Sequence, residues 1–296
     1  MRVLVTGGCG FLGAALAARA RAEGHEVTTL DASVDADVTC DVADSAAVVA
    51  AFEQAKPEAA IHLAAVLTDS GERDPLACVR VNALGSATVF AAADASGVKR
   101  VIYASSNAAV GPSSRSLGDA APLDPRTVYG VTKAFGEHLA RAMSTRAGAP
   151  SYLALRFGWI YGLGRVRGWS EPQKVLASAI AGERHIVYPD YSDPIDWTYV
   201  DDAVDVLMRA LECPLPHFAV CNTMGDRRRM AEAIAYLQHR FPGLTAEPVP
   251  AQTPTSGWAL VNDGLVALLG TKPRIKLEEG IDRLIAAQTA APPPPG

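Results

Sequence analysis

The sequence predicts an α/β fold: a doubly wound parallel sheet followed by a smaller C-terminal substrate-binding lobe. Three observations predict it. Short apolar runs rich in β-branched residues alternate with segments of helical period, and the runs are continuously apolar, as in strands buried on both faces. A glycine-rich turn follows the first run. Glycine and proline become frequent after about residue 157, which indicates excursions away from the sheet.

The expected strands are spread over the first three quarters of the chain. A run such as Ala59–Leu63 is apolar at almost every position, which is typical of a central parallel strand. The predicted strands are Arg2–Thr6, Glu26–Leu30, Asp37–Cys40, Ala59–Leu63, Arg100–Ala104, Tyr152–Phe157 and Phe218–Asn222.

The expected helices lie between these strands. Gly24 and Gly97 stand where left-handed helix ends are favoured, Ser45 is a candidate N-cap, and Pro75 a candidate first helical residue. The predicted helices are Phe11–Glu23, Ser45–Gln54, Pro75–Ser96 and Val128–Gly148. A strand and helix over Thr198–Leu211 are expected to rejoin the sheet.

These elements predict two domains and a tail. Residues 1–157, together with about 196–222, are expected to form a nucleotide-binding domain. Residues 158–195 and 223–288 are expected to form the smaller lobe. The proline-rich end, residues 289–296, is expected to be a flexible tail because proline cannot continue a helix.

Composition and charge narrow the class of protein. The 296 residues are 49% hydrophobic and 20% charged, which suits an ordinary globular protein. No run approaches ~18 consecutive apolar residues, so no membrane span is expected. A net charge of −5 opposes nucleic-acid binding. The five scattered cysteines form no CxxC pair, so no zinc site, metal or disulfide framework is expected. With no recognisable signal peptide, a cytoplasmic location is expected.

The glycine-rich turn predicts a dinucleotide site. It contains Gly8-x-Gly10-x-x-Gly13 and, overlapping it, Gly7-x-x-Gly10-x-x-Gly13. Glycines permit a tight turn in which backbone N–H groups approach a pyrophosphate, and the following helix directs its positive end at that group. This is the signature of a Rossmann fold.

An acidic residue completes the signature. Asp31 ends the second strand, 18 positions after Gly13, close to the ~20 expected. Its carboxylate is expected to accept hydrogen bonds from the adenosine ribose and to repel a 2′-phosphate. The predicted cofactor is therefore NAD rather than NADP.

A tyrosine and a lysine form the candidate catalytic pair. Tyr129 and Lys133 are four residues apart on a predicted helix and therefore share a face. A phenol has a pKa of ~10, and a nearby ammonium is expected to lower that pKa. The pair can then move a proton to or from a secondary alcohol while hydride is exchanged with nicotinamide. Ser105, Ser106 and Asn107 end the preceding strand, at the edge where open parallel sheets bind ligands.

The order of these motifs resembles that of a known family. The motifs are Gly7-x-x-Gly10-x-x-Gly13, Asp41-Val42, Leu63-Ala64-Ala65, Asn82, Ser105-Ser106 and Tyr129-x-x-x-Lys133. The chain resembles an extended short-chain dehydrogenase/reductase of the NAD-dependent epimerase/dehydratase family over nearly its whole length. The resemblance extends to Trp197–Ala203 and Lys272–Gly280. Around Ser105–Asn107 and Tyr129–Glu137 it is also similar to uronate dehydrogenases.

The resemblance implies roles for individual residues. Ser106 would bind the reacting oxygen, Tyr129 would be the acid/base, and Lys133 would hold the nicotinamide ribose. His62 is expected to be a core residue rather than a base. The other implied cofactor contacts are Gly7, Gly10, Phe11, Leu12, Gly13, Asp41, Val42, Leu63, Ala64, Ala65 and Asn82. A homodimer through the helices Pro75–Ser96 and Val128–Gly148 is also implied.

Two departures from the family pattern bear on the substrate. Asn107 and Ala108 replace an acidic pair that dehydratases carry, so dehydration is disfavoured. Ile195 stands where nucleotide-sugar enzymes often have an arginine for the diphosphate.

Other cations offer alternative anion ligands. Arg227, Arg228 and Arg229 form either an anion site or, as we favour, a solvated helix start. Arg156, Arg165 and Arg167 flank the expected cleft and offer partners for a carboxylate. Arg165 and Asn107, with Ser106, are the candidate substrate-binding residues.

The leading interpretation is an NAD-dependent oxidoreductase acting on a secondary alcohol of a sugar, sugar acid or related polyol. The first alternative is a nucleotide-sugar 4-epimerase that retains its NAD. The second is a non-catalytic NAD-binding module, which the presence of both Tyr129 and Lys133 disfavours.

Overall fold

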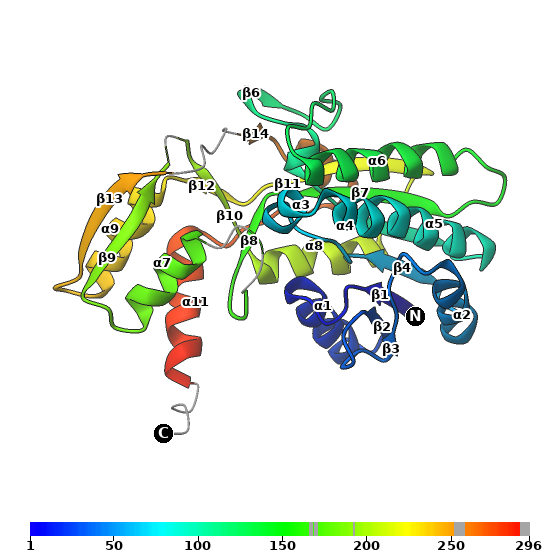
Figure 1. The fold of residues 1–296 in the computed structure, drawn as a ribbon, viewed down its shortest axis with the longest axis horizontal. Helices are drawn as coiled ribbons and strands as arrows, with labels where there is room; N and C mark the ends of the chain where they lie inside the picture. Colours follow the sequence, from blue (N-terminus) through cyan, green and yellow to red (C-terminus); the bar gives the residue numbers. More distant parts are fainter. Residues whose placement is uncertain (166–167, 169–170, 192, 252–257, 291–296) are drawn as a thin grey trace.

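A computed structural model describes residues 1–165, 168, 171–191, 193–251 and 258–290. A seven-stranded parallel sheet, in the order β11-β7-β5-β4-β1-β2-β3, crosses the larger part of the molecule (Figure 1). Every strand predicted within residues 2–157, and the one predicted at Phe218, lies in this sheet, so these predictions are confirmed. The strands are β1 Arg2–Thr6, β2 Glu26–Asp31, β3 Val38–Thr39, β4 Ala59–His62, β5 Arg100–Ser106, β7 Ser151–Phe157 and β11 Phe218–Thr223.

Helices cover both faces of the sheet because its strands are apolar on both sides. On β1, Val3 and Val5 pack into one core with α1 and α8, while Leu4 packs into a second core with α2, α5 and α6. The bounds are α1 Phe11–Ala22, α8 Val200–Glu212, α2 Ser45–Ala55, α5 Gly85–Ala95 and α6 Val128–Met143. The doubly wound α/β prediction is confirmed.

The helix ends follow the sequence signals with one exception. Gly24 and Gly97 have φ of +84° and +67°, as expected for residues that end helices. Ser45 was expected to cap α2, but Asp44 does so. The Asp44 carboxylate accepts hydrogen bonds from the backbone N–H groups of Ala46 and Ala47. A carboxylate at this position also interacts favourably with the helix dipole.

The predicted helix over Pro75–Ser96 is three segments. It begins at Pro75, as expected, with α4 Pro75–Cys78, continues as the π-helix η1 Val79–Leu84 and ends as α5. Within the described residues, the stretch Pro75–Ala95 is the one helix long and apolar enough to cross a membrane, with a mean hydropathy of 1.5. Half of it is buried inside the protein, and buried core helices meet the same criterion, so this is weak support for a span.

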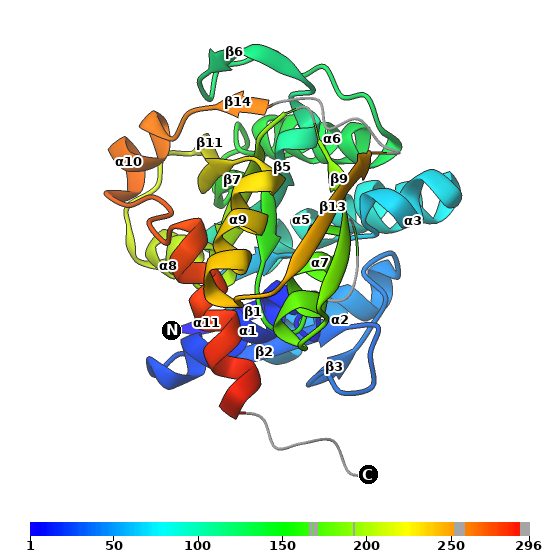
Figure 2. The ribbon, with the colours of Figure 1, turned by 90° about the vertical axis from the view of Figure 1, so that its left-hand side faces the viewer.

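A smaller group of elements lies beyond the sheet (Figures 1 and 2). In it, β9 and β13 pair in parallel, with α7 and α9 packed against β9. The bounds are α7 Glu171–Ile180, β9 His185–Asp190, α9 Met230–Arg240, β13 Thr245–Pro250 and α11 Leu277–Ala290. The domain boundaries given above stay predictions, and residues 291–296 of the expected tail lie outside the described residues.

A three-stranded sheet, β12-β10-β8, stands apart from the main sheet. Its strands are β8 Trp159–Tyr161, β10 Ile195–Tyr199 and β12 Asp226–Arg228. The strand expected to rejoin the main sheet at Thr198 is part of β10, so that expectation is wrong. The edge beside β7 is taken by β11, and β10 instead pairs with β8.

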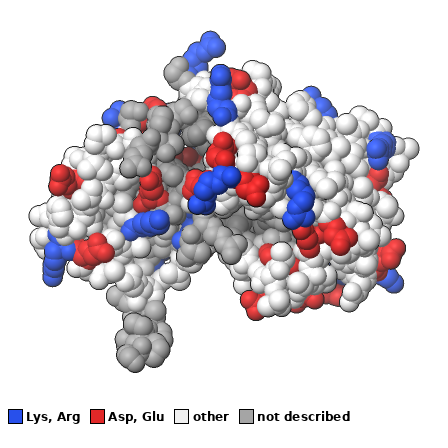
Figure 3. Space-filling view, in the orientation of Figure 1, with Lys and Arg blue, Asp and Glu red and all other residues white. Residues whose placement is uncertain are grey.

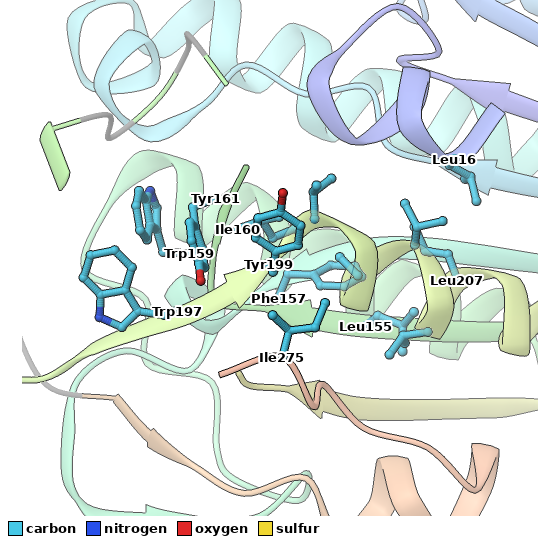
Figure 4. Packing of buried hydrophobic residues seen from close by; sticks show 14 of the residues in the cluster. Leu16, Leu155, Phe157, Trp159, Ile160, Tyr161, Trp197, Tyr199, Leu207 and Ile275 are labelled. Atoms are coloured by element: carbon cyan, nitrogen blue, oxygen red, sulfur yellow. The ribbon is translucent and has the colours of Figure 1, made fainter. Parts of the chain in front are cut away.

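An aromatic cluster holds this small sheet in the core (Figure 4). The Trp197 ring meets the rings of Trp159 and Tyr161 edge-on, with centroids 5.1 and 5.4 Å apart. Tyr161 and Tyr199 meet in the same way at 5.3 Å. Such contacts add stability beyond that of buried area alone.

Short elements complete the chain around the sheet. They are α3 Thr68–Arg73, the 3-10 turn η2 Asn107–Ala109, β6 Ser113–Leu117, β14 Trp258–Leu260 and α10 Asp263–Leu269. β6 pairs with β14, so the segment between Ser106 and Tyr129 is joined to the C-terminal part of the chain.

Candidate active site

A cleft of about 1490 Å³ includes residues from the carboxyl ends of β1, β2, β4, β5 and β7. Figure 3 shows a hollow between the two parts of the molecule. The cleft exceeds the ~300–1,000 Å³ typical of small-ligand pockets, so it has room for a dinucleotide and a substrate. It is lined by these predicted site residues: Gly7, Gly10, Phe11, Leu12, Gly13, Asp31, Asp41, Val42, Leu63, Ala64, Ala65, Ser106, Asn107, Tyr129, Lys133 and Arg165.

The glycine turn fits a pyrophosphate. Gly7 has φ of +69°, and a Cβ there would lie 2.7 Å from the backbone nitrogen of Ala64. A Cβ on Gly13 would overlap the carbonyl oxygen of Gly7. The N-cap of α1 is Gly10, which brings no side-chain hydrogen bond to the first turn. The first N–H groups of α1 are therefore open to an anionic ligand.

The two expected adenosine contacts are held by backbone hydrogen bonds. Asp31 accepts from the N–H groups of Cys9, at 3.1 Å, and Ser33, at 3.0 Å. Asp41 accepts from the N–H of Ala43, which lowers the pKa of the carboxyl, as does its ion pair with Arg80 at 2.7 Å.

Tyr129 and Lys133 lie together on α6, which begins at a capped end. The Thr127 hydroxyl accepts from the N–H of Gly130 at 2.9 Å, and this fixes the first turn. Lys133 is 2% exposed, and its Nζ donates to the carbonyl of Ala104 at 2.7 Å. The same Nζ lies 5.5 Å from the centroid of the Tyr129 ring.

The electrostatics of Tyr129 differ from the expectation in one respect. Burial raises the pKa of Tyr129 to about 12, while a hydrogen bond with Ser106 and the charge of Arg165 oppose that rise. Lys133 was expected to lower the Tyr129 pKa. Its ammonium is itself buried and directed at Ala104, and burial lowers the pKa of Lys133 to about 8. Arg165 is therefore the cation that favours the phenolate.

Asn82, an implied cofactor contact, and His62, an expected core residue, do not line the cleft but lie behind its wall. Asn82, in η1, is 1% exposed and exchanges hydrogen bonds with both backbone groups of Val66, which lines the cleft. Its amide also donates to Thr132 on α6. His62 is a core residue, as expected: its ring contacts Thr6 and Ser86, and burial lowers its pKa to about 3, so it stays neutral.

The arginines proposed for the substrate separate into two groups. Arg165 lines the cleft, and its guanidinium carbon lies 5.6 Å from the centroid of the Trp159 ring and 5.9 Å from that of Phe11. Arg156 does not reach the cleft; it is 3% exposed and forms a bidentate ion pair with Glu137. Its expected role is therefore wrong. Arg167 lies outside the described residues.

The run Arg227–Arg229 is a helix start only at its last residue, because Arg227 and Arg228 lie in the strand β12. Arg228 forms ion pairs with Glu232 and Glu278, and Arg229 is the N-cap of α9. Among the described residues, no group of three or more His, Cys, Asp and Glu side chains is placed to hold a metal ion.

Asp196 is a cleft residue that the sequence reasoning missed. It lines the cleft from β10 beside Pro194 and Ile195. A signal was present: an acidic residue interrupts the apolar run of Ile195, Trp197 and Tyr199, all three of which are buried. A charged residue within a buried strand needs a partner or a function.

A Rossmann sheet with a glycine-rich turn and a Tyr-x-x-x-Lys pair defines an oxidoreductase that uses a nicotinamide dinucleotide. The family model of the NAD dependent epimerase/dehydratase family matches residues 3–220. The chain belongs to this family, and it is an NAD-dependent enzyme.

Three known proteins illustrate the similarity. A probable UDP-glucuronate 4-epimerase from Rhizobium meliloti is 28% identical over 96% of both chains. A uronate dehydrogenase from Pseudomonas putida is 33% identical over 53% of this chain and 60% of its own. The structure of MoeE5 with UDP-glucuronic acid and NAD is 26% identical, with a TM-score of 0.84 and coverage of 98% and 99%.

Proposed function

We propose that the protein is an NAD-dependent dehydrogenase that acts on a secondary alcohol of a sugar acid or related polyol without a nucleoside diphosphate. The observation that carries this proposal is the position of Arg165. It lines the same cleft as Tyr129 and its charge acts on the phenol. An arginine in a partly desolvated site is well suited to hold a carboxylate.

Among the described residues, the wall expected to meet a diphosphate is formed by Pro194, Ile195 and Asp196, none of which is a cation. Ile195 is 3% exposed and offers no donor, and Asp196 follows it. A diphosphate there would be desolvated opposite an isoleucine and an acid, which is costly. The similarity to the uronate dehydrogenase supports the same substrate class.

The chain supplies the proton chemistry. NAD, when bound, accepts the hydride. We assign Tyr129 to the removal of the alcohol proton, Ser106 to hydrogen bonding of the reacting oxygen, and Lys133 to the nicotinamide ribose. Asp31 would hold the adenosine ribose, and the turn from Gly7 to Gly13 the pyrophosphate. Asn107, which lines the cleft beside Ser106, is assigned to the substrate.

A substrate panel tests this proposal. The purified protein is incubated with NAD and with glucuronate, galacturonate, L-arabinose, UDP-glucose or UDP-glucuronic acid, and NADH absorbance is followed. We expect NADH to form with a free sugar acid or sugar and not with the UDP-sugars. Turnover of the UDP-sugars alone would contradict the proposal.

The second candidate is a nucleotide-sugar 4-epimerase. The observation that favours it is the similarity to the Rhizobium protein over nearly the full length of both chains. An epimerase re-reduces its intermediate, so it would invert UDP-glucuronic acid without net NADH. Chromatography of the sugar products separates the two functions.

We also propose a cytoplasmic homodimer. Exposed apolar side chains gather on α4, η1 and α6, within the helical segments expected to pair: Leu76, Val79, Leu84, Val131 and Phe135. Because η1 and α4 pack beside α6, these side chains lie on neighbouring helices. An apolar patch of this kind is typical of a protein interface. All five cysteines are free, which suits a reducing compartment.

A further inference from the structure

An aromatic ring lies against Arg165 at the wall of the cleft. The guanidinium carbon of Arg165 is 5.6 Å from the centroid of the Trp159 ring, and both residues line the cleft. A guanidinium within about 6 Å of a tryptophan ring is attracted to the ring, most strongly where water is excluded. None of the roles assigned above to Ser106, Tyr129 or Lys133 involves Trp159.

The Trp159 ring is fixed in place because other buried rings pack against it (Figure 4). It is 7% exposed, stacks on Tyr161 with centroids 5.6 Å apart, and meets Trp197 edge-on at 5.1 Å. Tyr161 and Trp197 are themselves fully buried. Since the ring is already ordered by this packing, it can hold a cation without a further loss of side-chain entropy.

A second ring near the guanidinium comes from the cofactor turn. Phe11 begins α1 and lines the cleft, and its ring centroid is 5.9 Å from the guanidinium carbon of Arg165. Phe11 also meets the loop that carries Arg165, because a Cβ on Gly162 would lie 3.2 Å from Cζ of Phe11. The N–H of Arg165 donates to the carbonyl of Gly162 at 3.4 Å. Arg165 therefore lies where the cofactor turn meets the substrate side of the cleft.

The guanidinium keeps its charge in this environment. Burial lowers the pKa of Arg165 to about 10, while Tyr129 and Asp69 favour the charged form. The N–H donors of a guanidinium lie in its plane, whereas an aromatic ring contacts its face. Contact with Trp159 is therefore compatible with recognition of a carboxylate by the same side chain.

We propose that Trp159 is a positioning residue for the substrate: its ring holds the Arg165 guanidinium at the cleft, and this gives a substrate carboxylate its advantage over an uncharged group. This inference rests on the proposed function and deepens it, because it names the contact that makes a sugar acid the preferred substrate. Without the ring, Arg165 would have to be ordered by the substrate itself, and that cost would weaken binding of the carboxylate.

Pairs of sugars that differ only at C6 test this inference. Glucuronate and galacturonate carry a carboxylate at C6, whereas glucose and galactose carry a hydroxymethyl group. The purified protein is incubated with NAD and each sugar, and initial rates of NADH formation give kcat/KM. The acid preference is the kcat/KM of an acid divided by that of its neutral counterpart.

Three variants are compared with the unmodified protein. Trp159→Leu removes the ring, and Trp159→Phe keeps a smaller one. Tyr199→Leu is the matched control: Tyr199 is buried in the same aromatic cluster, and the guanidinium carbon of Arg283 is 5.6 Å from its ring centroid. Tyr199 is not among the described residues that line the cleft.

The unmodified protein should prefer the acid by at least about tenfold. Trp159→Leu should lower kcat/KM for the acid by about tenfold and largely spare the neutral sugar, so that the acid preference falls towards one. Trp159→Phe should lie between these two proteins, because phenylalanine attracts a cation less strongly than tryptophan does. Tyr199→Leu should keep the full preference. A purely structural role of Trp159 would lower kcat/KM for both sugars alike.

Two outcomes overturn the inference and leave the proposed function standing. One is an unchanged acid preference in Trp159→Leu or, if that variant does not fold, in Trp159→Phe. The other is equal oxidation of acid and neutral sugar by the unmodified protein. If none of the four sugars is oxidised, the inference fails together with the proposed function.

Discussion

At Tyr129, two opposing effects set the proton affinity of the phenol. Burial favours the neutral form, and the hydrogen bond with Ser106 and the charge of Arg165 favour the phenolate. Arg165 thus has two consequences at one place: it assists proton removal and offers a partner for a substrate carboxylate.

The first prediction concerns Tyr129→Phe. Removal of the hydroxyl should lower kcat by about 10²–10⁴, because no other group is assigned to move the proton. Fold and NAD affinity should stay nearly unchanged, as measured by circular dichroism and by NAD titration. Near-normal turnover would show that Tyr129 is not the proton carrier.

The second prediction concerns cofactor choice at Asp31. The unmodified protein should bind NAD more tightly than NADP, because this carboxylate stands where a 2′-phosphate would be placed. Asp31→Ala should narrow the difference in Kd, as measured by fluorescence titration of both cofactors. A preference of the unmodified protein for NADP would contradict it.

The third prediction concerns the buried ammonium of Lys133. Its folded-state pKa of about 8 lies below the ordinary lysine pKa of 10.5, so below about pH 8 the folded chain holds a desolvated charge. Between these two values the unfolded chain binds more protons, and stability therefore rises with pH. Without NAD, Lys133→Met should be more stable at about pH 7, by up to about 3 kcal/mol less about 1 kcal/mol for the lost hydrogen bond.

That advantage should shrink as the pH rises. Urea unfolding of both proteins at about pH 7 and about pH 9.5 measures it. Lys99→Met, at an exposed position, is the control and should show little change at either pH. An advantage that grows with pH would contradict the reasoning.

Among single residues, those in local motifs could be predicted from the sequence, whereas those placed by distant contacts could not. The glycines of the turn were predicted because their motif is local. The burial of Arg156 was not, because its partner Glu137 is 19 positions away and on another element. The place of Asp196 at the edge of the cleft depends on its close approach to Gly158, which is 38 positions away in sequence.

At the scale of elements, α6 holds the end of β5 at two points. Lys133 donates to the carbonyl of Ala104, and Glu137, one turn later, accepts from the Ser105 hydroxyl at 2.5 Å. The two contacts hold Ala104 and Ser105, the two residues before Ser106. They set the position of Ser106 relative to Tyr129, which is on α6 as Lys133 and Glu137 are.

The fourth prediction concerns Glu137→Gln, which alters the contact between α6 and the end of β5. The substitution leaves the buried Arg156 without a carboxylate and should lower the free energy of unfolding by about 3–5 kcal/mol. Glu279→Gln breaks an exposed pair with Arg283 and should cost about 1 kcal/mol or less. Urea unfolding measures both, and equal effects would contradict the prediction.

The strands were predictable because parallel strands buried on both faces are continuously apolar. Less of the fold could be predicted where contacts between distant elements determine the local structure. The π-helix η1 has the same apolar pattern as an α-helix, and its Asn82 turns towards Val66 and Thr132. The strand β10 has the pattern of a sheet strand, but β8 is its partner.

At the scale of the whole molecule, the fifth prediction concerns the proposed homodimer. Phe135→Glu should place a charge in the apolar patch on α6 and halve the mass seen by light scattering. Val187→Glu, at an exposed apolar position on β9 in the smaller group of elements, should leave the mass unchanged. A monomeric unmodified protein would contradict the dimer.

The pairing of β6 with β14 has a consequence for the order in which the protein matures during translation. The backbone N–H of Val261 donates to the carbonyl of Leu117, in the segment that joins Ser106 to Tyr129. A nascent chain that has left the ribosome as far as Thr223 has all seven strands of the central sheet, but not this support. The dinucleotide-binding part can therefore assemble first, while the substrate side of the site is completed only after β14 has been synthesised.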